Sequence, residues 1–287
     1  MRHIAVGDFK IEQDEKVAIN KVLENGKISE WKKVREFEQL FAEYVGTRYC
    51  LAVSSGTAAL LVGLLALIYD RRYPRVKRGS KVITSPVTYI ATSNAIKLTG
   101  LEPVYVDIDP QTFVLRPDLI EQCLSSAENP DEYCMILPVH LMGYPCDMDE
   151  INRVAQKYGL VTFEDSAQAH GSLYKQKRTG SLSLLSDFSF YIAHNIQAGE
   201  MGAIITNDDK LYTMMRKLKA NGRMCECFVC TRSEGRCPIL KKQKDDDDRD
   251  PRFLHDWIGY NFKTMEFQAA LGVCQVRKAD FIFHTGE

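Results

Sequence analysis

The sequence predicts an α/β protein with a mostly parallel, seven-stranded sheet sandwiched by helices. Seven short apolar runs rich in β-forming residues follow one another along the chain: CLAV from residue 50, VIT at 82, PVYVD at 103, MILPV at 135, LVTFED at 160, FSFY at 188 and AIIT at 203. Segments of helix length separate these runs, which is typical of parallel strands covered on both faces. At 287 residues with 45% hydrophobic content, the chain can also bury a sizeable core.

Two amphipathic helices are expected before the first strand. Apolar residues recur at spacings of three and four over 12–24 and 34–45, on either side of a break at Asn25-Gly26. We therefore predict an N-terminal helical lead-in over residues 1–48 and a large domain, which contains the seven strands, over residues 49–222.

The charge balance argues against two classes of partner. The chain has 37 basic and 38 acidic residues and a formal net charge of -1, so no overall field favours nucleic acid or an acidic membrane surface. It shows no apolar run of signal-peptide length near its start and no uncharged stretch long enough to span a bilayer. We expect a cytoplasmic protein that binds neither nucleic acid nor membrane.

Three groups of polar residues directly follow predicted strands, at the edge where parallel sheets bind ligands. Ser54-Ser55-Gly56-Thr57 precedes the apolar helix AALLVGLLALI, so its amides could hold a phosphate, although ordinary N-capping alone explains the pattern better. Tyr89 could stack on a flat ring or be a core or surface tyrosine. Asp165, at the end of LVTFED, could pair with a protonated pyridine nitrogen or cap a helix.

The most informative stretch is SDFSFYIAHNIQAGEMG, over residues 186–202. A strand from Phe188 to Tyr191 is expected to lead through a turn rich in His, Asn and Gly into a second strand over 203–206. This stretch resembles the hairpin that anchors the cofactor in enzymes that use pyridoxal phosphate (PLP). Those enzymes need a lysine in the turn, because a primary amine links covalently to the cofactor aldehyde.

The turn of this chain carries His194 in place of that lysine. No lysine occurs between Lys177 and Lys210, so a shift of the alignment by one residue does not recover one. An imidazole cannot form the covalent link, but it can move a proton near neutral pH.

Taken together, these residues resemble the DegT/DnrJ/EryC1/StrS family of PLP-dependent nucleotide-sugar enzymes. The resemblance runs from about residue 5 to about residue 283 through seven ordered blocks: SSGTAAL, TYIATSNAI, LEPVYVDIDPQTF, EDSAQAHGS, DFSFYIAHN, GEMGAIIT and IGYNFKTMEFQAALGVCQ. It implies the PLP-dependent transferase fold of type I. By this resemblance the cofactor phosphate would be held by Gly56, Thr57 and Ser189.

The same resemblance implies contacts to the cofactor ring and to a second subunit. Tyr89 would stack on the ring, Asp165 would meet its nitrogen and Gln168 would approach its 3-hydroxyl group. Asn261, in GYN, matches a family residue that reaches the phosphate in the neighbouring subunit, and a homodimer is implied.

His194 separates this chain from the aminotransferase members of the family. The surrounding SFYIAH is similar to the SFYPAH-like segments of a 3-dehydratase branch, which acts on 4-keto-6-deoxy hexoses and holds its cofactor without a covalent link. In that branch pyridoxamine phosphate (PMP) condenses with the C4 ketone, a histidine removes a proton from the cofactor methylene, and the C3 hydroxyl leaves. The resemblance thus implies 3-dehydration of a nucleotide-linked keto sugar with His194 as base. Because EDSAQAHG is more similar to the aminotransferases, an aminotransferase-like enzyme is an alternative, and a non-catalytic paralogue is another.

The chain also departs from the family near its end. Members normally continue into a smaller C-terminal domain, whereas this sequence stops soon after MEFQAALGVCQVRKADF. We expect residues 257–287 to be the start of a C-terminal small domain that is largely missing, together with part of the sugar-binding cleft.

A Cys-rich and acidic loop is predicted over residues 223–256. Its thiols follow the pattern Cys225-x-Cys227-x2-Cys230-x6-Cys237. Four thiols this close in a reduced protein can enclose a zinc ion or an iron–sulfur cluster, and free thiols are the alternative. An iron–sulfur cluster would imply a reductase partner, although Ala167 stands where iron–sulfur members of the dehydratase branch carry a further cysteine.

Overall fold

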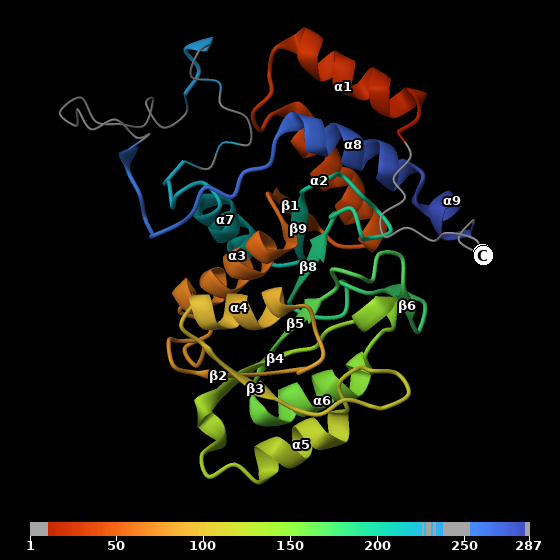
Figure 1. Ribbon diagram of the computed structural model, residues 1–287. Coiled ribbons are helices and arrows are strands. Elements are labelled where there is room, and N and C mark those ends of the chain that lie inside the picture. Colours follow the sequence, from red (N-terminus) through yellow and green to blue (C-terminus); the bar gives the residue numbers. More distant parts are fainter. Residues whose placement is uncertain (1–10, 226, 228–230, 232–233, 238–252, 285–287) are drawn as a thin grey trace, which may run out of the picture.

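The computed structural model describes residues 11–225, 227, 231, 234–237 and 253–284 of the chain (Figure 1). Its centre is a seven-stranded sheet with the order β1-β9-β8-β5-β4-β2-β3. The strands are β1 (Tyr49–Val53), β2 (Lys81–Thr84), β3 (Glu102–Tyr105), β4 (Tyr133–Leu137), β5 (Val161–Asp165), β8 (Leu185–Ser189) and β9 (Gly202–Thr206). Within this sheet β9 runs antiparallel to β1 and β8, and the other neighbours are parallel. The predicted mostly parallel, seven-stranded sheet is confirmed.

One local prediction about a strand was wrong, and one pair of short strands was not predicted. The strand expected at 188–191 ends at Ser189, because Tyr191 opens a turn whose carbonyl accepts the backbone N–H of His194 at 2.9 Å. A small hairpin of β6 (Leu173–Tyr174) and β7 (Lys177–Arg178) lies outside the main sheet and was not predicted. Strands of two residues contain no apolar run from which they could be recognised.

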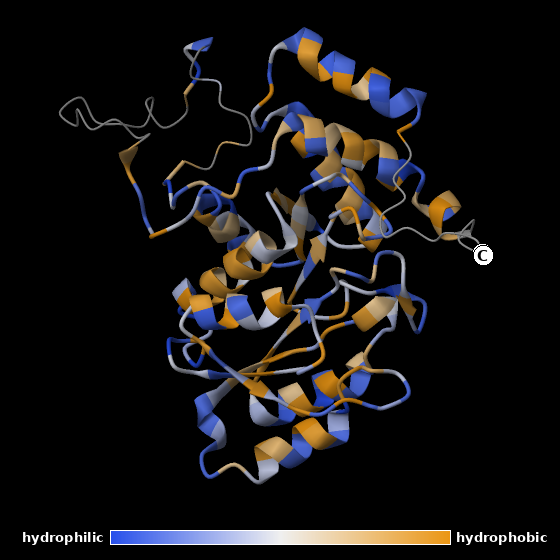
Figure 2. Cartoon of the chain, in the orientation of Figure 1, coloured by the Kyte–Doolittle hydropathy of each residue, from blue (hydrophilic) through white to orange (hydrophobic). Residues whose placement is uncertain are grey.

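Helices α3 (Gly56–Tyr69), α4 (Ile90–Leu98) and α7 (Asp209–Leu218) cover one face of the sheet. They pack on side chains such as Leu51 of β1 and Phe163 of β5. Figure 2 shows α3 mostly in the colours of apolar residues, as expected for a helix that is buried over most of its length.

The other face is covered by two separate groups of helices. Helices α5 (Pro117–Ser125) and α6 (Met148–Tyr158) pack on β2 and β4, while α2 (Lys32–Val45) and α8 (Glu266–Arg277) pack on β1, β8 and β9. Successive side chains of a strand point to opposite faces of the sheet. Leu51 therefore packs in the core on one face, and its neighbour Ala52 packs in the core on the other. The sheet is therefore sandwiched by helices, as predicted.

The beginning and the end of the described chain lie together. Helix α1 (Gln13–Asn25) and helix α2 correspond to the helices expected at 12–24 and 34–45, and both contact α8, which α9 (Ala279–His284) follows (Figure 1). Glu266, the first residue of α8, accepts the backbone N–H groups of Trp31, Lys33 and Val34 at 2.8, 2.8 and 3.0 Å. This one carboxylate thus satisfies three donors at the start of α2. The division into a lead-in, a large domain, a loop and a C-terminal start stays a prediction.

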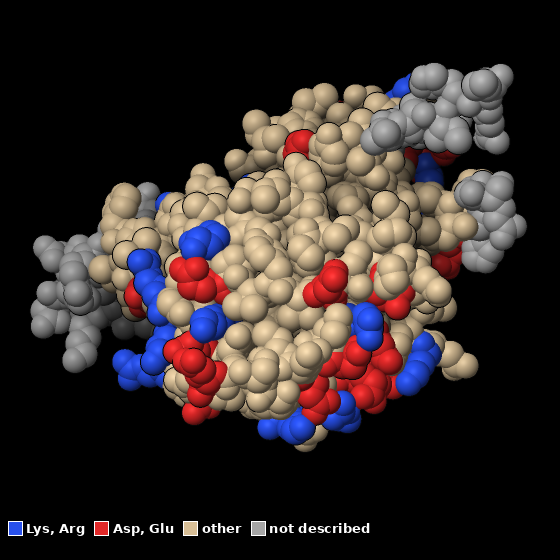
Figure 3. All heavy atoms as spheres, turned by 60° about the horizontal axis from the view of Figure 1, so that its bottom comes forward, with Lys and Arg blue, Asp and Glu red and all other residues tan. Residues whose placement is uncertain are grey.

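Short 3-10 turns at Pro130–Glu132 and Leu141–Gly143 complete the described elements. None of the helices in the described ranges is long and apolar enough to cross a membrane. Figure 3 shows the molecule turned so that the bottom of Figure 1 comes forward. On this face basic and acidic side chains lie next to one another. Glu121 of α5, for example, pairs with Arg153 and Lys157 of α6.

Candidate active site

A cavity of about 460 Å³ lies at the carboxyl ends of the parallel strands. The ends of β1, β4, β5 and β8 and the N-terminus of α3 form its wall. The predicted site residues that line it are Gly56, Thr57, Tyr89, Asp165, Gln168, Ser189 and His194. Segments that are more than a hundred residues apart in the sequence therefore meet at one place.

The N-terminus of α3 forms one end of the cavity. Ser55 caps this helix, since its hydroxyl accepts the backbone N–H of Ala58 at 3.1 Å. The helix offers no acceptor of its own for the N–H groups of Gly56 and Thr57, which border the cavity. Ordinary capping by Ser55, one of the two alternatives that the sequence left open, therefore does not exclude anion binding at the same helix end.

The glycine at this helix end is required by close packing. A Cβ atom on Gly56 would lie 2.7 Å from the Cβ of Ser189, the last residue of β8. A Cβ atom on Gly202, at the start of β9, would lie 2.2 Å from the carbonyl oxygen of Ser55. The backbone of the helix N-terminus is therefore pressed against the ends of two strands, which brings the Ser189 hydroxyl beside the helix amides.

Asp165 lies in the floor of the cavity at the end of β5. Its carboxylate accepts the Thr92 hydroxyl at 2.7 Å and the backbone N–H of Ala167 at 3.2 Å. Burial raises the pKa of this carboxyl group, and these two donors act in the opposite direction by stabilising its charged form. Thr92 belongs to α4, so this hydrogen bond to Asp165 forms only because α4 packs against the sheet.

A buried pair behind Asp165 holds its strand in place. His140 accepts the backbone N–H of Cys146 at Nδ1 (3.0 Å) and donates from Nε2 to Glu164 at 2.9 Å. Glu164 also accepts the backbone N–H groups of Gly180 and Leu182 at 2.8 and 3.0 Å. Because the backbone N–H of His140 donates to the carbonyl of Asp165 at 3.0 Å, this network fixes the cavity floor.

The ring-contacting residues expected from the sequence lie at the cavity rim. Tyr89 directly precedes α4, lines the cavity and is 72% exposed, so much of its ring is accessible at the opening. Gln168 follows β5, and its Oε1 accepts the backbone N–H of Met142 at 2.7 Å. That bond orients the amide of Gln168 at the cavity wall.

His194 lies on the turn after β8 and lines the cavity with a half-buried ring. Burial lowers its pKa from the usual value of 6.5, so the imidazole is neutral at pH 7 and can accept a proton. None of the described residues that line the cavity is a lysine. The structure thus places an imidazole, and no primary amine, on this wall.

Asp187 is a cavity residue that the sequence interpretation missed. It lies on β8 beside Asp165 in the paired register of the two strands, and it is fully buried. In the part of the chain that the structure describes, neither carboxylate oxygen of Asp187 has a hydrogen-bond partner. The available signal was a charged residue at an inward position of an apolar strand, two places before Ser189.

Asn261 does not belong to the cavity in this chain. It is exposed and forms an isolated bridge with Ala220, on the segment between α7 and α8. Its predicted contact to the cofactor of a neighbouring subunit stays a prediction.

The predicted metal site is only partly within the described residues. Cys230 lies outside them, and Cys225, Cys227 and Cys237 do not form a group with metal-ligand spacing in the described ranges. The acidic part of the loop, within residues 238–252, also lies outside the described residues.

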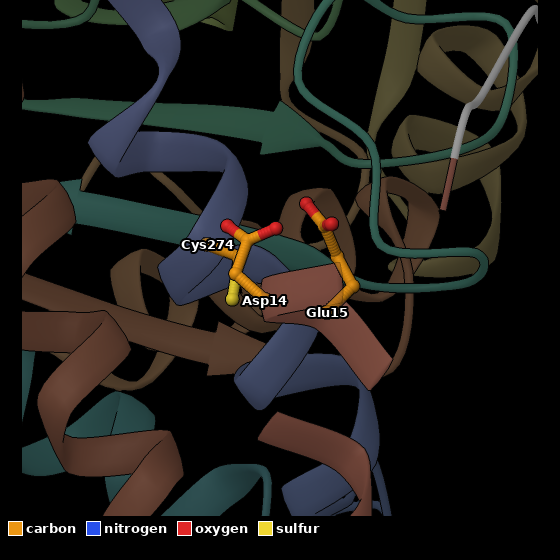
Figure 4. Close-up of side chains that lie close together, drawn as sticks. All are labelled: Asp14, Glu15 and Cys274. Carbon is orange, nitrogen blue, oxygen red and sulfur yellow. The ribbon is translucent and has the colours of Figure 1, made fainter. Parts of the chain in front are cut away.

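One other group of potential ligands lies close together among the described residues: Asp14, Glu15 and Cys274 (Figure 4). The Lys278 ammonium donates to Asp14 and Glu15, at 2.8 Å in each case. This ammonium is already paired with both carboxylates, so we interpret the group as an ion-pair cluster between α1 and the segment after α8.

Comparisons with known proteins agree on one family. The model of the DegT/DnrJ/EryC1/StrS aminotransferase family matches residues 10–285. GDP-perosamine synthase of Escherichia coli O157:H7 is 34% identical over 281 residues, which cover 98% of this chain and 67% of the relative. The five curated relatives compared are covered over 54 to 67% of their length, so the chain spans little more than half to two thirds of them.

Two solved structures illustrate the similarity in fold. GDP-4-keto-6-deoxy-D-mannose-3-dehydratase of E. coli with bound hydrated PLP has a TM-score of 0.83 at 28% identity, covering 98% of this chain and 69% of that chain. An aminotransferase from Psychrobacter cryohalolentis has a TM-score of 0.79 at 31% identity, covering 95% of this chain and 63% of that chain. The two solved structures thus come from a dehydratase and from an aminotransferase.

Proposed function

The chain belongs to the DegT/DnrJ/EryC1/StrS aminotransferase family, and we propose that it is a PLP- or PMP-dependent enzyme acting on a nucleotide-linked keto sugar. The reaction that we propose is 3-dehydration of a 4-keto-6-deoxy sugar nucleotide. The observation that carries this proposal is the position of His194, a half-buried imidazole on a cavity wall whose described lining contains no lysine.

The described cavity fits the cofactor in its chemistry. The cofactor has a phosphate, a flat ring and a basic ring nitrogen, and the cavity offers a helix N-terminus, an exposed tyrosine ring and the buried Asp165 carboxyl group. The unpartnered carboxyl group of Asp187 also calls for a donor inside the cavity. We propose that the phosphate is held by Gly56, Thr57 and Ser189.

Each cavity residue would have a separate role toward the cofactor or the substrate. When bound, the cofactor supplies an amine that condenses with a ketone and a ring that accepts electrons. Asp165 would keep the ring nitrogen protonated, Tyr89 would cover the ring, and Gln168 would bond its hydroxyl group. His194 would take up a proton at an imidazole nitrogen, which its lowered pKa leaves free at pH 7.

An anaerobic incubation with PMP and GDP-4-keto-6-deoxymannose tests this function. We expect the sugar to lose water, with no nitrogen retained in the final product, and we expect His194→Asn to abolish this loss while the protein still binds PMP. Retention of the sugar unchanged by a protein that binds both molecules would overturn the dehydratase proposal.

An aminotransferase-like activity is the second candidate. It is supported by the similarity of EDSAQAHG to aminotransferases and by the name of the E. coli O157:H7 relative. It would require exchange with an amino donor without a lysine, which we expect to be slow. In the same incubation with glutamate added, this candidate predicts a stable amino sugar. A non-catalytic paralogue, the third candidate, predicts that neither PLP nor PMP binds.

We also propose a homodimer. Large apolar side chains near the cavity rim are exposed in the single chain, namely Tyr89, Ile90 and Met142. Such surface is typical of an interface, and the exposed Asn261 would then reach the partner's cofactor. Light scattering of the purified chain, with a monomer as the contradicting result, tests this proposal.

The metal at the Cys loop stays a separate proposal. Zinc or an iron–sulfur cluster held by Cys225, Cys227, Cys230 and Cys237 would be detected by metal analysis of anaerobically purified protein. A reductase partner follows only if iron and sulfide are found.

A further inference from the structure

The two aspartates in the cavity floor differ in their surroundings. Asp165 and Asp187 are partners in the parallel register of β5 and β8, and both are buried. Asp165 accepts two hydrogen bonds, from Thr92 and Ala167, whereas Asp187 accepts none from the described residues. A buried carboxylate without donors is costly, so a ligand or a proton must compensate the charge of Asp187.

The groups that face this pair include no cation whose charge is left uncompensated. The titratable side chains that line the cavity are Tyr89, His140, Asp165, Asp187, Tyr191, His194 and Glu200. Burial lowers the pKa of His140, but its interactions with Cys146 and Glu164 outweigh burial and raise it to about 10. A charge on this ring is compensated by Glu164 at 2.9 Å, and the lowered pKa of His194 keeps that ring neutral. The described cavity lining contains neither lysine nor arginine.

Two adjacent buried carboxyl groups without an uncompensated cation beside them hold one proton between them. Burial and the neighbouring Asp165 both raise the pKa of Asp187 well above its ordinary value. The hydrogen bonds that Asp165 accepts favour its ionised form, so the shared proton resides on Asp187.

We propose that Asp187 is a second carboxyl group for the cofactor's ring nitrogen, and that it gives up its proton when the protonated ring binds. The proposal rests on the proposed function, because it requires PLP or PMP in this cavity. The ring nitrogen of the free cofactor already carries a proton at neutral pH. On binding, the O–H bond of Asp187 would break, its electron pair would stay on the carboxylate oxygen, and its proton would pass to solvent.

This arrangement has a consequence for cofactor binding that an ordinary single aspartate lacks. Binding of the ring displaces one proton from the pair, whereas a single aspartate that is already ionised has none to release. The pyridinium would be flanked by two carboxylates, which strengthens the binding of the cofactor and the capacity of the ring to accept electrons.

Calorimetry measures the proton count directly. PLP is titrated into the cofactor-free full chain at neutral pH in PIPES and in imidazole, which have neither a primary amine that reacts with PLP nor a phosphate that competes with it. The difference in enthalpy between these buffers gives the protons exchanged with solvent. Asp187→Asn should release about one proton fewer per site than the unaltered protein, because the carboxylic acid is gone. Glu200→Gln, which removes another carboxyl group from the cavity wall, should leave the count unchanged.

A second measurement needs no variant. Infrared difference spectra of the unaltered protein should show that a carboxylic-acid C=O band disappears when PLP is added, and Asp187→Asn should lack this band. An equal proton count in the two proteins, or an unaltered protein without such a band, overturns the proposal. If the unaltered chain binds no PLP, the proposed function fails as well, which distinguishes that failure from one confined to Asp187.

Discussion

The imidazole rings of His170 and His194 lie 6.1 Å apart between their centroids, although 23 residues separate them in the chain. His170 is 2% exposed and contacts the rings of Phe41, Phe188 and Phe190. Burial and the nearby His194 lower its pKa to about 3. The inner ring is therefore neutral at pH 7 and packs among aromatic rings behind the outer one.

The buried His170 should make the protein sensitive to acid. Its pKa is about 3 in the folded state against 6.5 when unfolded, so below pH 6.5 the unfolded chain binds a proton that the folded chain does not. The free energy of unfolding should be independent of this group above pH 6.5 and fall as the pH drops toward 3. By about pH 5 the loss should reach about 2 kcal/mol.

Urea denaturation at about pH 8 and pH 5 tests this sensitivity. His170→Phe should remove most of the additional loss at the lower pH, because it replaces the ring within the same aromatic cluster. His255→Gln, at an exposed position, should lose as much stability as the unaltered protein. If His170→Phe loses as much stability at the lower pH as the unaltered protein, His170 is not the source of the acid sensitivity.

Restoring the family's lysine should change the colour of the protein. His194→Lys places a primary amine on the cavity wall, and the half-buried position should favour its neutral, reactive form. With PLP, this variant should give a yellow protein in which borohydride fixes the cofactor to the chain. His194→Gln is the matched control and should bind PLP without such a bond. If the lysine variant binds PLP that borohydride does not fix, position 194 does not face the cofactor aldehyde.

The contact between Gly56 and Ser189 should be sensitive to a single methyl group. A Cβ atom at position 56 would lie 2.7 Å from the Cβ of Ser189, so Gly56→Ala must displace the helix end from β8. We expect a loss of stability of about 1–3 kcal/mol and weaker PLP binding. The thermal midpoint and a PLP titration measure the two effects.

Removing the opposing atom should rescue stability but not binding. Gly56→Ala combined with Ser189→Gly takes away the atoms that clash, so the double variant should recover stability relative to Gly56→Ala alone. PLP binding should stay weak, because the Ser189 hydroxyl is gone. Additive losses of stability in the double variant would show that the clash is not the cause.

Glu266, at the start of α8, should be costly to neutralise. It accepts three backbone N–H groups at the start of α2 and is buried. In Glu266→Gln an amide nitrogen would replace one carboxylate oxygen and would face a backbone N–H group that it cannot accept. This should lower the free energy of unfolding by about 2 kcal/mol. Glu36→Gln, on the exposed ion pair with Arg277 between the same two helices, should cost less than about 1 kcal/mol. Equal costs in urea denaturation would refute the capping role.

Much of the fold was predictable because its signals are local. Each strand of the main sheet coincides with an apolar run, and the break at Gly26 ends α1 with a left-handed φ of 63°. The end of β8 was misplaced by two residues, since FSFY stays apolar where the turn has already begun. The β6–β7 hairpin was missed because its strands carry no periodic pattern.

The site was predictable where residues follow a strand directly. Gly56, Asp165 and Ser189 come at strand or helix ends, and parallel strands gather such ends at one edge. Thr92 and His140 were missed because their importance depends on contacts made across the sheet.

The sequence by itself determined the succession of strands and helices along the chain, the family resemblance and the replacement of lysine by His194. These features depend on residue type and on spacing along the chain. Only the tertiary structure decided that Asp187 lies beside Asp165 without a donor, that His170 packs behind His194, and that Glu266 caps a helix more than two hundred residues away. Burial and charge compensation are properties of the surroundings of a side chain, and those surroundings exist only once distant segments have packed.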